Sequence, residues 1–328
     1  MSVFILHPGK ANYPEIEAYS DCLAQRGVPV EHGDLSALNR VAENRRAVLW
    51  CIMGLYRALP PARFVVHDYR SLSVGRMAFV KDWIKRALNA RPNLRIFQNV
   101  RMRDAMGFSD GVPSLLLPMG VPDWIFDVTD DDATSMPAGK FCYIGEMSRE
   151  RGFHKVLGAF RDARRDPSEA LILVGRPEPS ILDEFRDVPG IVFTGRVPQQ
   201  DALRIVRRSD HAICYFPYHR PHCFQTPTKL LEYAALGKSI ICNDAPSNVL
   251  AARELDIRCH VTGPRIFDEL FSGAPIALQR NDPRKIVSLE WSRVIERSGV
   301  LERIGAATGQ APLMTHQRVR VNEGGQTR

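Results

Sequence analysis

Apolar residues in the first half of the chain gather in short runs, separated by stretches with helical spacing. The runs indicate buried strands, because near-continuous apolar segments between helices are typical of a parallel sheet covered on both faces. Helical spacing predicts helices at 15–26 and 77–88. The predicted strands are 3–6, 48–53, 64–67, 94–97 and 114–117.

The second half repeats this alternation more regularly, which predicts a second doubly wound sheet. Between the halves, the segment 118–123 is rich in Pro and Gly, and the acidic stretch 127–139 follows it without a pattern. A late apolar helix is predicted at 286–297. The predicted strands are 141–145, 170–175, 191–194, 212–216 and 239–243, and the predicted helices are 153–164, 181–186, 199–208 and 227–236.

The composition is that of an ordinary globular protein, with 328 residues, 45% hydrophobic and 25% charged. No secretory signal and no membrane-spanning run of about 20 apolar residues is visible in the pattern. The seven cysteines form no Cys-x-x-Cys pair, and most lie inside apolar runs such as 141–144 and 240–242. We therefore expect reduced, buried thiols in a cytoplasmic protein without a zinc site.

The net charge of +7 is concentrated in one region. From Arg40 to Arg103 there are fourteen Lys or Arg residues against three acids, Glu43, Asp68 and Asp82. This excess fits either a solvated face with some ion pairs or a surface for an anionic partner, such as lipid phosphates or a phosphorylated acceptor. Nucleic acid is not expected as a partner, because only the high isoelectric point supports it and no recognisable module is present.

The segment 226–238 carries the most informative pattern of the chain. Thr226 suits the N-cap of a helix, Pro227 suits its first position, and Gly237 suits a left-handed end. An ordinary amphipathic helix would show the same features. The polar and charged residues within the helix favour the other interpretation, a helix that binds a ligand.

Thr228, Lys229 and Glu232 follow one another at helical spacing. A helix start with a Lys beside it binds anions, and a Glu one turn further can accept hydrogen bonds from sugar hydroxyls. The run Thr-Pro-Thr-Lys-Leu-Leu-Glu-Tyr resembles the donor-binding helix of retaining GT-B glycosyltransferases, glycosyltransferase family 4 or "glycosyl transferases group 1". The resemblance implies that Glu232 holds a ribose and that Thr226, Thr228 and Lys229 hold a diphosphate.

The loop after the strand 141–145 is similar to the phosphate-binding loop of that family. Gly145 allows a ligand to approach the backbone, and Arg151 places a cation at the start of the next helix. Glu146 stands where the family has an Arg, and Arg149 is the candidate to compensate for it. A plain strand-turn-helix with exposed arginines is the alternative interpretation.

Gly175 and Gly195 end two further strands at the sheet edge where α/β proteins bind ligands. With Gly145, they occur in the family's order. One position departs from it: many members carry a second Glu against the transferred sugar, and Phe224 occupies that place. Candidates to contact the sugar or phosphate instead, or plain surface residues, are His219, Arg220, His222 and Gln225.

His67 and Asp68 close a predicted strand and are the catalytic candidates of the first domain, with Lys229 from the second. Asp68 suits a general base if the reaction inverts configuration, because a base must reach the acceptor hydroxyl. If configuration is retained, the departing phosphate takes the proton and His67 orients the sugar. Alternatively, Asp68 caps the next helix or pairs with Arg70.

The resemblance implies the fold class α/β with two Rossmann-like, doubly wound parallel-sheet domains facing a cleft, the GT-B fold. The expected units are an acceptor domain (1–125), a linker (126–138), a nucleotide-sugar domain (139–283), a crossover helix (284–310) and a flexible tail (311–328).

The implied reaction moves a sugar from a nucleotide diphosphate, UDP- or GDP-sugar, to a glycan or lipid-linked acceptor. We expect a role in cell-surface polysaccharide or lipopolysaccharide synthesis, on the inner face of the membrane, with no cofactor or metal ion. A non-catalytic scaffold of the same fold and a sugar-nucleotide epimerase are the alternatives.

Overall fold

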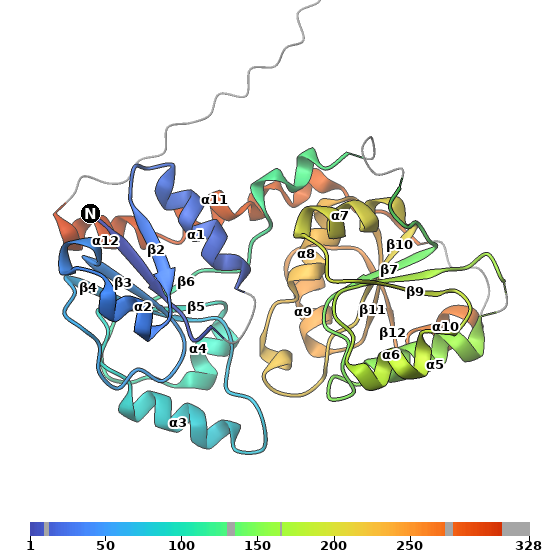
Figure 1. Ribbon diagram of the computed structural model, residues 1–328, viewed down its shortest axis with the longest axis horizontal. Coiled ribbons are helices and arrows are strands. Elements are labelled where there is room, and N and C mark those ends of the chain that lie inside the picture. Colours follow the sequence, from blue (N-terminus) through green and yellow to red (C-terminus); the bar gives the residue numbers. More distant parts are fainter. Residues whose placement is uncertain (10–12, 130–134, 165, 273–277, 310–328) are drawn as a thin grey trace, which may run out of the picture.

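The protein folds into two lobes, each built on one six-stranded sheet (Figure 1). The computed structural model describes residues 1–9, 13–129, 135–164, 166–272 and 278–309. All neighbouring strands within both sheets run parallel. The predicted fold class, α/β with two Rossmann-like sheets, is confirmed. The predicted tail at 311–328 and the acidic run at 130–132 lie outside the described residues.

The N-terminal sheet has the strand order β2-β1-β3-β4-β5-β6. Its inner strands β1 and β3 are buried along their whole length, as their apolar sequences require. The strands are β1 (Val3–Leu6), β2 (Val30–Gly33), β3 (Val48–Ile52), β4 (Phe64–Tyr69), β5 (Leu94–Phe97) and β6 (Ser114–Leu116). The helices are α1 (Pro14–Ala24), α2 (Leu35–Arg40), α3 (Ala78–Leu88) and α4 (Val100–Met106), with short 3-10 turns at Glu43–Arg45 and Asp123–Asp127.

The C-terminal sheet has the order β12-β11-β10-β7-β8-β9, so the chain begins at β7 in its middle and winds outward on both sides. The strands are β7 (Phe141–Ile144), β8 (Leu171–Val174), β9 (Ile191–Gly195), β10 (His211–Cys214), β11 (Ser239–Asn243) and β12 (Cys259–Thr262). The helices are α5 (Phe153–Ala163), α6 (Pro179–Phe185), α7 (Gln199–Arg208), α8 (Thr228–Ala235), α9 (Pro246–Glu254) and α10 (Phe267–Ser272), with a 3-10 turn at His222–Phe224.

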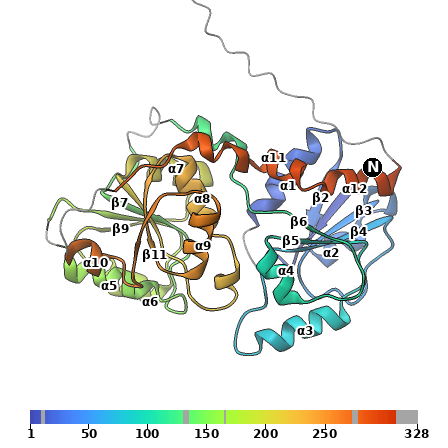
Figure 2. The same ribbon diagram turned by 180° about the vertical axis from the view of Figure 1, so that it is seen from behind.

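After the second sheet the chain returns to the first lobe (Figure 2). Helix α11 (Trp291–Arg297) packs on α1, and α12 (Val300–Thr308) follows it. The Trp291 ring meets the Tyr19 ring edge-on at 6.1 Å, and the Trp291 N–H donates to the Val121 carbonyl at 3.0 Å. A Cβ on Gly120 would lie 2.7 Å from the Trp291 ring, so only glycine fits there. This is the return that the family resemblance implies.

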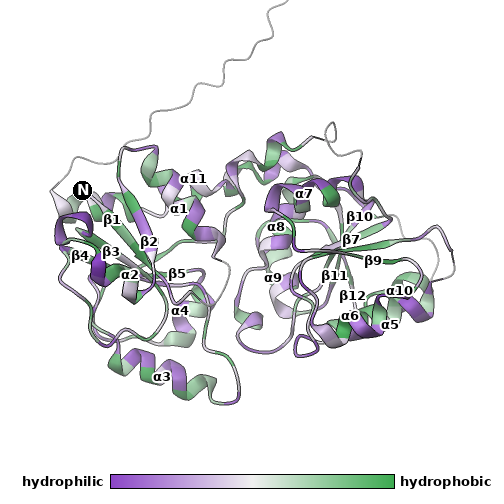
Figure 3. Ribbon diagram, in the orientation of Figure 1, coloured by the Kyte–Doolittle hydropathy of each residue, from purple (hydrophilic) through white to green (hydrophobic). Residues whose placement is uncertain are grey.

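Each of the ten predicted strands is confirmed to within two residues. The predicted helix at 286–297 is wrong in its first part, because 3-10 turns at Pro283–Lys285 and Val287–Leu289 precede α11. The edge strands β2 and β12 were not anticipated. Figure 3 shows apolar residues along the inner strands and alternating character on the covering helices. All seven cysteines are free thiols, and five of them are buried.

In the part of the chain that the structure describes, no helix combines the length and apolar character needed to cross a bilayer.

Candidate functional site

Three glycine-ended loops meet at the carboxyl edge of the C-terminal sheet. Gly145 and Gly175 follow the strands β7 and β8, and Gly195 is the last residue of the neighbouring strand β9. Gly145 and Gly175 have φ of 142° and 134°, a region that L side chains rarely adopt. A Cβ on Gly175 would collide with the Gly145 carbonyl oxygen. The two glycines therefore let the loops approach each other closely and leave their backbone open to a ligand.

Helix α8 faces these loops, but it begins one residue later than the sequence suggested. Pro227 is the N-cap and Thr228 is the first helical residue, so the predicted N-cap role of Thr226 is wrong. The Thr226 N–H instead donates to the Gln98 side chain of the N-terminal lobe at 2.7 Å. Gly237 ends the helix in the predicted left-handed conformation, with φ of 69°.

Lys229 reaches from the first turn of α8 to the loop after β7. Its ammonium group lies 3.0 Å from the Tyr143 hydroxyl, 4.1 Å from the centre of that ring and 3.4 Å from the Tyr215 carbonyl oxygen. A Cβ on Gly145 would lie 3.0 Å from the ammonium nitrogen. The structure thus brings together Lys229 and Gly145, and the pair offers a cation and open backbone to one anionic group.

Glu232 lies one turn further along α8 and is buried, with 7% of its surface exposed. Its Oε1 accepts a hydrogen bond of 2.7 Å from the Gln199 side chain at the start of α7. Burial raises the pKa of Glu232 to about 7, although Gln199 and Lys229 act in the opposite direction. The carboxyl group is therefore held in a low-dielectric position, where each further hydrogen bond to its ionised form counts strongly.

Gln199 also lines a cavity of about 730 Å³ between the two lobes. The N-terminal lobe contributes α1 to its wall, the segment before the second lobe contributes Trp124, and α11 contributes Trp291. Acidic side chains outnumber the cation Arg293 in this lining, namely Glu17, Asp21, Asp123, Asp127, Glu290 and Glu296. This potential disfavours phosphate, so the cavity suits an uncharged group better than a phosphate.

The two arginines of the β7 loop have different partners. Arg151 pairs with Glu146 at 2.8 Å, whereas Arg149 pairs with Glu184 on α6. Arg149, the predicted substitute for the missing family Arg, is thus paired with α6, and the cation beside Glu146 is Arg151. Both arginines line a pocket of about 410 Å³ at the start of α5.

This pocket at the start of α5 has a strongly basic lining. His154, Lys155 and His219 contribute to it together with the two arginines, against the single acid Glu150. Tyr215 connects it to the Lys229 position, because the Tyr215 hydroxyl donates to the Arg151 carbonyl at 2.7 Å. A helix N-terminus with these cations favours an anion.

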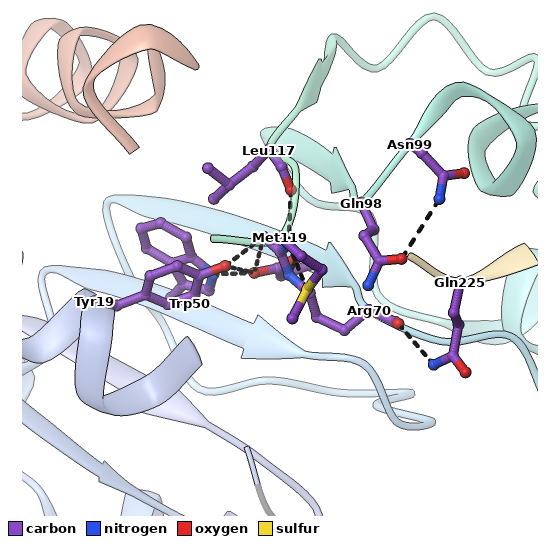
Figure 4. A network of polar contacts seen from close by, with 9 residues as sticks. Tyr19, Trp50, Arg70, Gln98, Asn99, Leu117, Met119 and Gln225 are labelled. Atoms are coloured by element: carbon purple, nitrogen blue, oxygen red, sulfur yellow. Dashed lines mark hydrogen bonds and ion pairs between the residues drawn. The ribbon is translucent and has the colours of Figure 1, made fainter. Parts of the chain in front are cut away.

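The loop 218–225 is held by the N-terminal lobe. The Phe224 side chain packs against a cluster that includes Tyr69, Phe97 and Met102, and its carbonyl accepts from the Asn99 side chain at 2.9 Å. Gln225 donates to the Arg70 carbonyl at 3.3 Å (Figure 4). The residue that replaces the family's second Glu therefore joins the two lobes.

A second connection between the lobes runs through Arg220. Its guanidinium pairs with Asp82 on α3 and lies over the rings of Phe79 and Phe224, at 4.5 and 5.3 Å. Burial lowers the pKa of the neighbouring His222 to about 4, so that imidazole is neutral at pH 7. Arg220 thus acts between the lobes and leaves the phosphate contacts to other residues.

The structure does not present Asp68 as a base. Its side chain has no exposed surface, and Oδ2 accepts from the Tyr19 hydroxyl at 2.8 Å and from the Trp50 ring nitrogen at 3.0 Å. Its Oδ1 pairs with the Arg70 Nε at 2.7 Å. Every side of the carboxylate is occupied, so the pairing with Arg70 is the interpretation that the geometry supports.

His67 is likewise enclosed, with 1% of its surface exposed. Neither ring nitrogen has a hydrogen-bond partner among the described residues. Burial and the nearby Arg95 lower the pKa of His67 to about 4. The geometry therefore gives His67 no contact with a ligand between the lobes.

Sequence reasoning missed Gln199 and Gln98. Each is a single polar residue that gains its partner only through the fold, Glu232 for Gln199 and the Thr226 backbone for Gln98. No local pattern marks either one. Among the residues that the structure covers, no three His, Cys, Asp or Glu side chains gather closely enough to hold a metal ion.

Comparison with known proteins finds a family model for part of the second lobe. Residues 138–264 match the family model described as "Glycosyl transferases group 1". No curated protein sequence matches the chain significantly.

Solved structures resemble almost the whole chain. AviGT4, a glycosyltransferase involved in avilamycin A biosynthesis, aligns with a TM-score of 0.59 and 15% identity over 94% of this chain and 99% of its own. HepE of Anabaena in complex with UDP-glucose aligns with a TM-score of 0.61 and 13% identity over 94% of this chain and 99% of its own. The α,α-trehalose-phosphate synthase (UDP-forming) of Burkholderia xenovorans in complex with glucose-6-phosphate aligns with a TM-score of 0.61 and 11% identity over 93% of this chain and 100% of its own. The shared fold is GT-B, and with the family match it identifies the chain as a glycosyltransferase.

Proposed function

We propose that this glycosyltransferase, with its GT-B fold and its group 1 donor domain, transfers a sugar from a UDP- or GDP-sugar to a glycan or lipid-linked acceptor. The observation that carries the proposal is the meeting of Lys229 with the open backbone of Gly145, one helical turn from the buried Glu232. HepE in complex with UDP-glucose supports a nucleotide sugar as donor.

In this proposal the donor lies along the carboxyl edge of the C-terminal sheet. Lys229, the backbone at Gly145 and the start of α8 stabilise the diphosphate, and Arg151 adds charge from the neighbouring pocket. Glu232 accepts from the ribose hydroxyls, positioned by Gln199. Stabilisation is greatest when the sugar–phosphate bond breaks, because the leaving diphosphate then gains charge.

We further propose that configuration at the sugar is retained. An inverting reaction requires a base at the acceptor hydroxyl, and Asp68 is fully engaged by Tyr19, Trp50 and Arg70. In a retaining reaction the departing phosphate accepts the acceptor's proton, so the protein supplies only position and charge. Proton NMR of the first product formed would show the same anomeric configuration as the donor.

The proposed acceptor is a glycan or a lipid-linked glycan, and the proposed role is cell-surface polysaccharide or lipopolysaccharide synthesis on the inner face of the membrane. The basic excess between Arg40 and Arg103 supports an anionic acceptor or surface on this lobe. The trehalose-phosphate synthase in complex with glucose-6-phosphate supports an anionic sugar as acceptor on this fold.

The deciding experiment is a calorimetric panel of UDP, GDP, ADP and CMP and their sugars on the wild type and on Glu232→Ala. One nucleotide should bind the wild type, and its affinity should fall by about tenfold or more in the variant, because hydrogen bonds to a charged group are lost. Glu254→Ala, which removes an exposed Glu from α9, is the matched control and should bind normally. Equal binding by Glu232→Ala would refute the donor site, and conversion of the donor without any acceptor would identify an epimerase.

A further inference from the structure

Residues 74–88 expose an unusual group of large apolar side chains. Phe79 is 74% exposed and Trp83 is 58% exposed, and Val74, Met77 and Val80 are also open to solvent. Single exposed apolar residues are normal on protein surfaces, whereas a contiguous group marks a surface that meets another apolar phase. We call residues 74–88 the α3 patch.

Helical geometry gathers the apolar residues of α3 on one side. At 100° per residue, Phe79, Trp83 and Val80 fall within about 100° of the helix circumference. Arg86 lies at one border of this sector and Lys81 lies beyond the other. The opposite side of the helix, with Ala78 and Asp82, is buried against the protein.

The charge of the patch is cationic on its outer side. Its exposed positive residues are Arg76, Lys81 and Arg86, whereas Lys85 is half-buried near the acid of the patch, Asp82. Asp82 points inward, because it pairs with Arg220 and accepts from the Ser73 backbone N–H at 3.0 Å. The exposed face therefore combines aromatic and aliphatic side chains with positive charge and no outward acid.

We propose that the α3 patch docks on the surface of an anionic lipid bilayer. Phe79, Val80 and Trp83 enter the boundary between headgroups and acyl chains, and the exposed Arg76 and Arg86 contact lipid phosphates. A helix of this kind, with Trp and Phe on one face and an arginine at its border, fits the membrane interface in both chemistry and charge. The lipid surface is the occupant that both features of the patch favour together.

The position of α3 connects this surface to the proposed reaction. Figure 1 places α3 at the outer end of the N-terminal lobe, on the side of the loop that precedes α8. Through Asp82 it holds Arg220, and Arg220 belongs to the loop that ends at the donor helix. Docking would present the space between the lobes to acceptors in the bilayer. This consequence rests on the proposed function, whereas docking itself does not.

The test measures binding of the full chain to vesicles of phosphatidylcholine with and without phosphatidylglycerol. Val80→Ser with Trp83→Ser removes two apolar contacts and spares Phe79, which touches Arg220. Leu35→Ser with Val249→Ser is the matched control, since these side chains are 42% and 40% exposed outside the patch. The wild type should bind only the anionic vesicles, the patch variant should bind about tenfold more weakly, and the control should match the wild type.

Tryptophan fluorescence and the salt dependence of vesicle binding provide two further tests. Trp83 is the most exposed of the four tryptophans, so wild-type emission should shift to shorter wavelength on anionic vesicles and become protected from iodide. Raised salt should weaken binding, because lipid charge is screened. Binding by the patch variant equal to the wild type would overturn the proposal. The proposal would also be overturned if the wild type bound no vesicles and formed a dimer that the same variant abolished, because a second copy would then occupy the patch.

Failure of docking and failure of the proposed function give different results. The patch variant should keep its affinity for the nucleotide and its transfer to a water-soluble acceptor, which also shows that it is folded. Loss of vesicle binding with donor binding intact supports the α3 patch. Absent donor binding in the wild type would refute the proposed function and leave the docking result unaffected.

Discussion

Replacing Glu232 by Gln should separate donor binding from the cost of burying a charge. The substitution keeps the size of the side chain and removes its ionisation. Burial raises the pKa of Glu232 from 4.5 to about 7, so the folded protein resists ionising this carboxyl. At ~1.4 kcal/mol per pH unit, a shift of about 2.5 units costs about 3 kcal/mol once the group is ionised.

The sign of this effect fixes its pH window. Below pH 4.5 the carboxyl is protonated in both the folded and the unfolded chain and costs nothing. Between pH 4.5 and about 7 the unfolded chain ionises first, so the wild type loses stability relative to Glu232→Gln. The free energy of unfolding, measured by urea denaturation, should therefore favour the variant by about 3 kcal/mol at pH 8. Glu15, also buried with a pKa of about 7, affects both proteins equally.

Donor binding should favour the wild type, whereas the free energy of unfolding favours Glu232→Gln. Ribose hydroxyls donate to the ionised carboxyl, so wild-type affinity for the nucleotide sugar should rise as pH increases through 7 and level off above it. The gain approaches tenfold per pH unit below the pKa if only the ionised form binds. Glu232→Gln should show a flat profile by calorimetry from acid to alkaline pH. Parallel profiles for the two proteins would refute the assignment of Glu232 to the ribose.

Three further substitutions test the site and its support. Lys229→Ala should lower kcat by about 100-fold or more while the donor Kd changes less, because its charge acts mainly on the leaving diphosphate; kinetics and calorimetry give the two values. Asp68→Asn should lower the free energy of unfolding by about 3 kcal/mol and leave the kcat of the folded enzyme nearly unchanged, because the carboxylate is internal. Arg220→Gln should cost about 3 kcal/mol in urea denaturation, and Arg220→Met with Asp82→Leu should restore much of it.

Each of these expectations has a clear opposite. Equal losses of donor affinity and turnover in Lys229→Ala would show that this cation already stabilises the bound donor in the ground state. A large loss of kcat in Asp68→Asn with stability preserved would make Asp68 catalytic. No loss in Arg220→Gln would show that the pair with Asp82 contributes nothing between the lobes.

Sequence patterns predicted the strands that contain an apolar run and missed two edge strands that carry polar residues. β1, β3 and β11 are continuous apolar runs because both of their faces are covered. β2 reads Val-Glu-His-Gly and β12 reads Cys-His-Val-Thr, since an edge strand keeps one side in water and carries polar residues. Their sequences do not differ from those of loops.

The site follows the same division between local and long-range information. Lys229 and Glu232 belong to one helix, so their spacing in the sequence was enough to predict both as residues of the site. Gln199 reaches Glu232 across 33 positions, and Phe224 packs on a cluster of the other lobe, so neither contact leaves a local signal. Asp68 was open to two interpretations for the same reason, because Tyr19 and Trp50 close around it only in the folded chain.

The return of α11 and α12 to the first lobe has a consequence for synthesis of the chain. The Thr308 hydroxyl lies 3.2 Å from the Met1 sulfur, and Trp291 packs on Tyr19, so segments far apart in the sequence complete one structural unit. Domains usually fold in the order in which the ribosome releases them. Here the second sheet is contiguous in sequence, whereas the first must wait until residues 291–308 emerge. We expect the donor lobe to mature first and the N-terminal lobe to be completed after it.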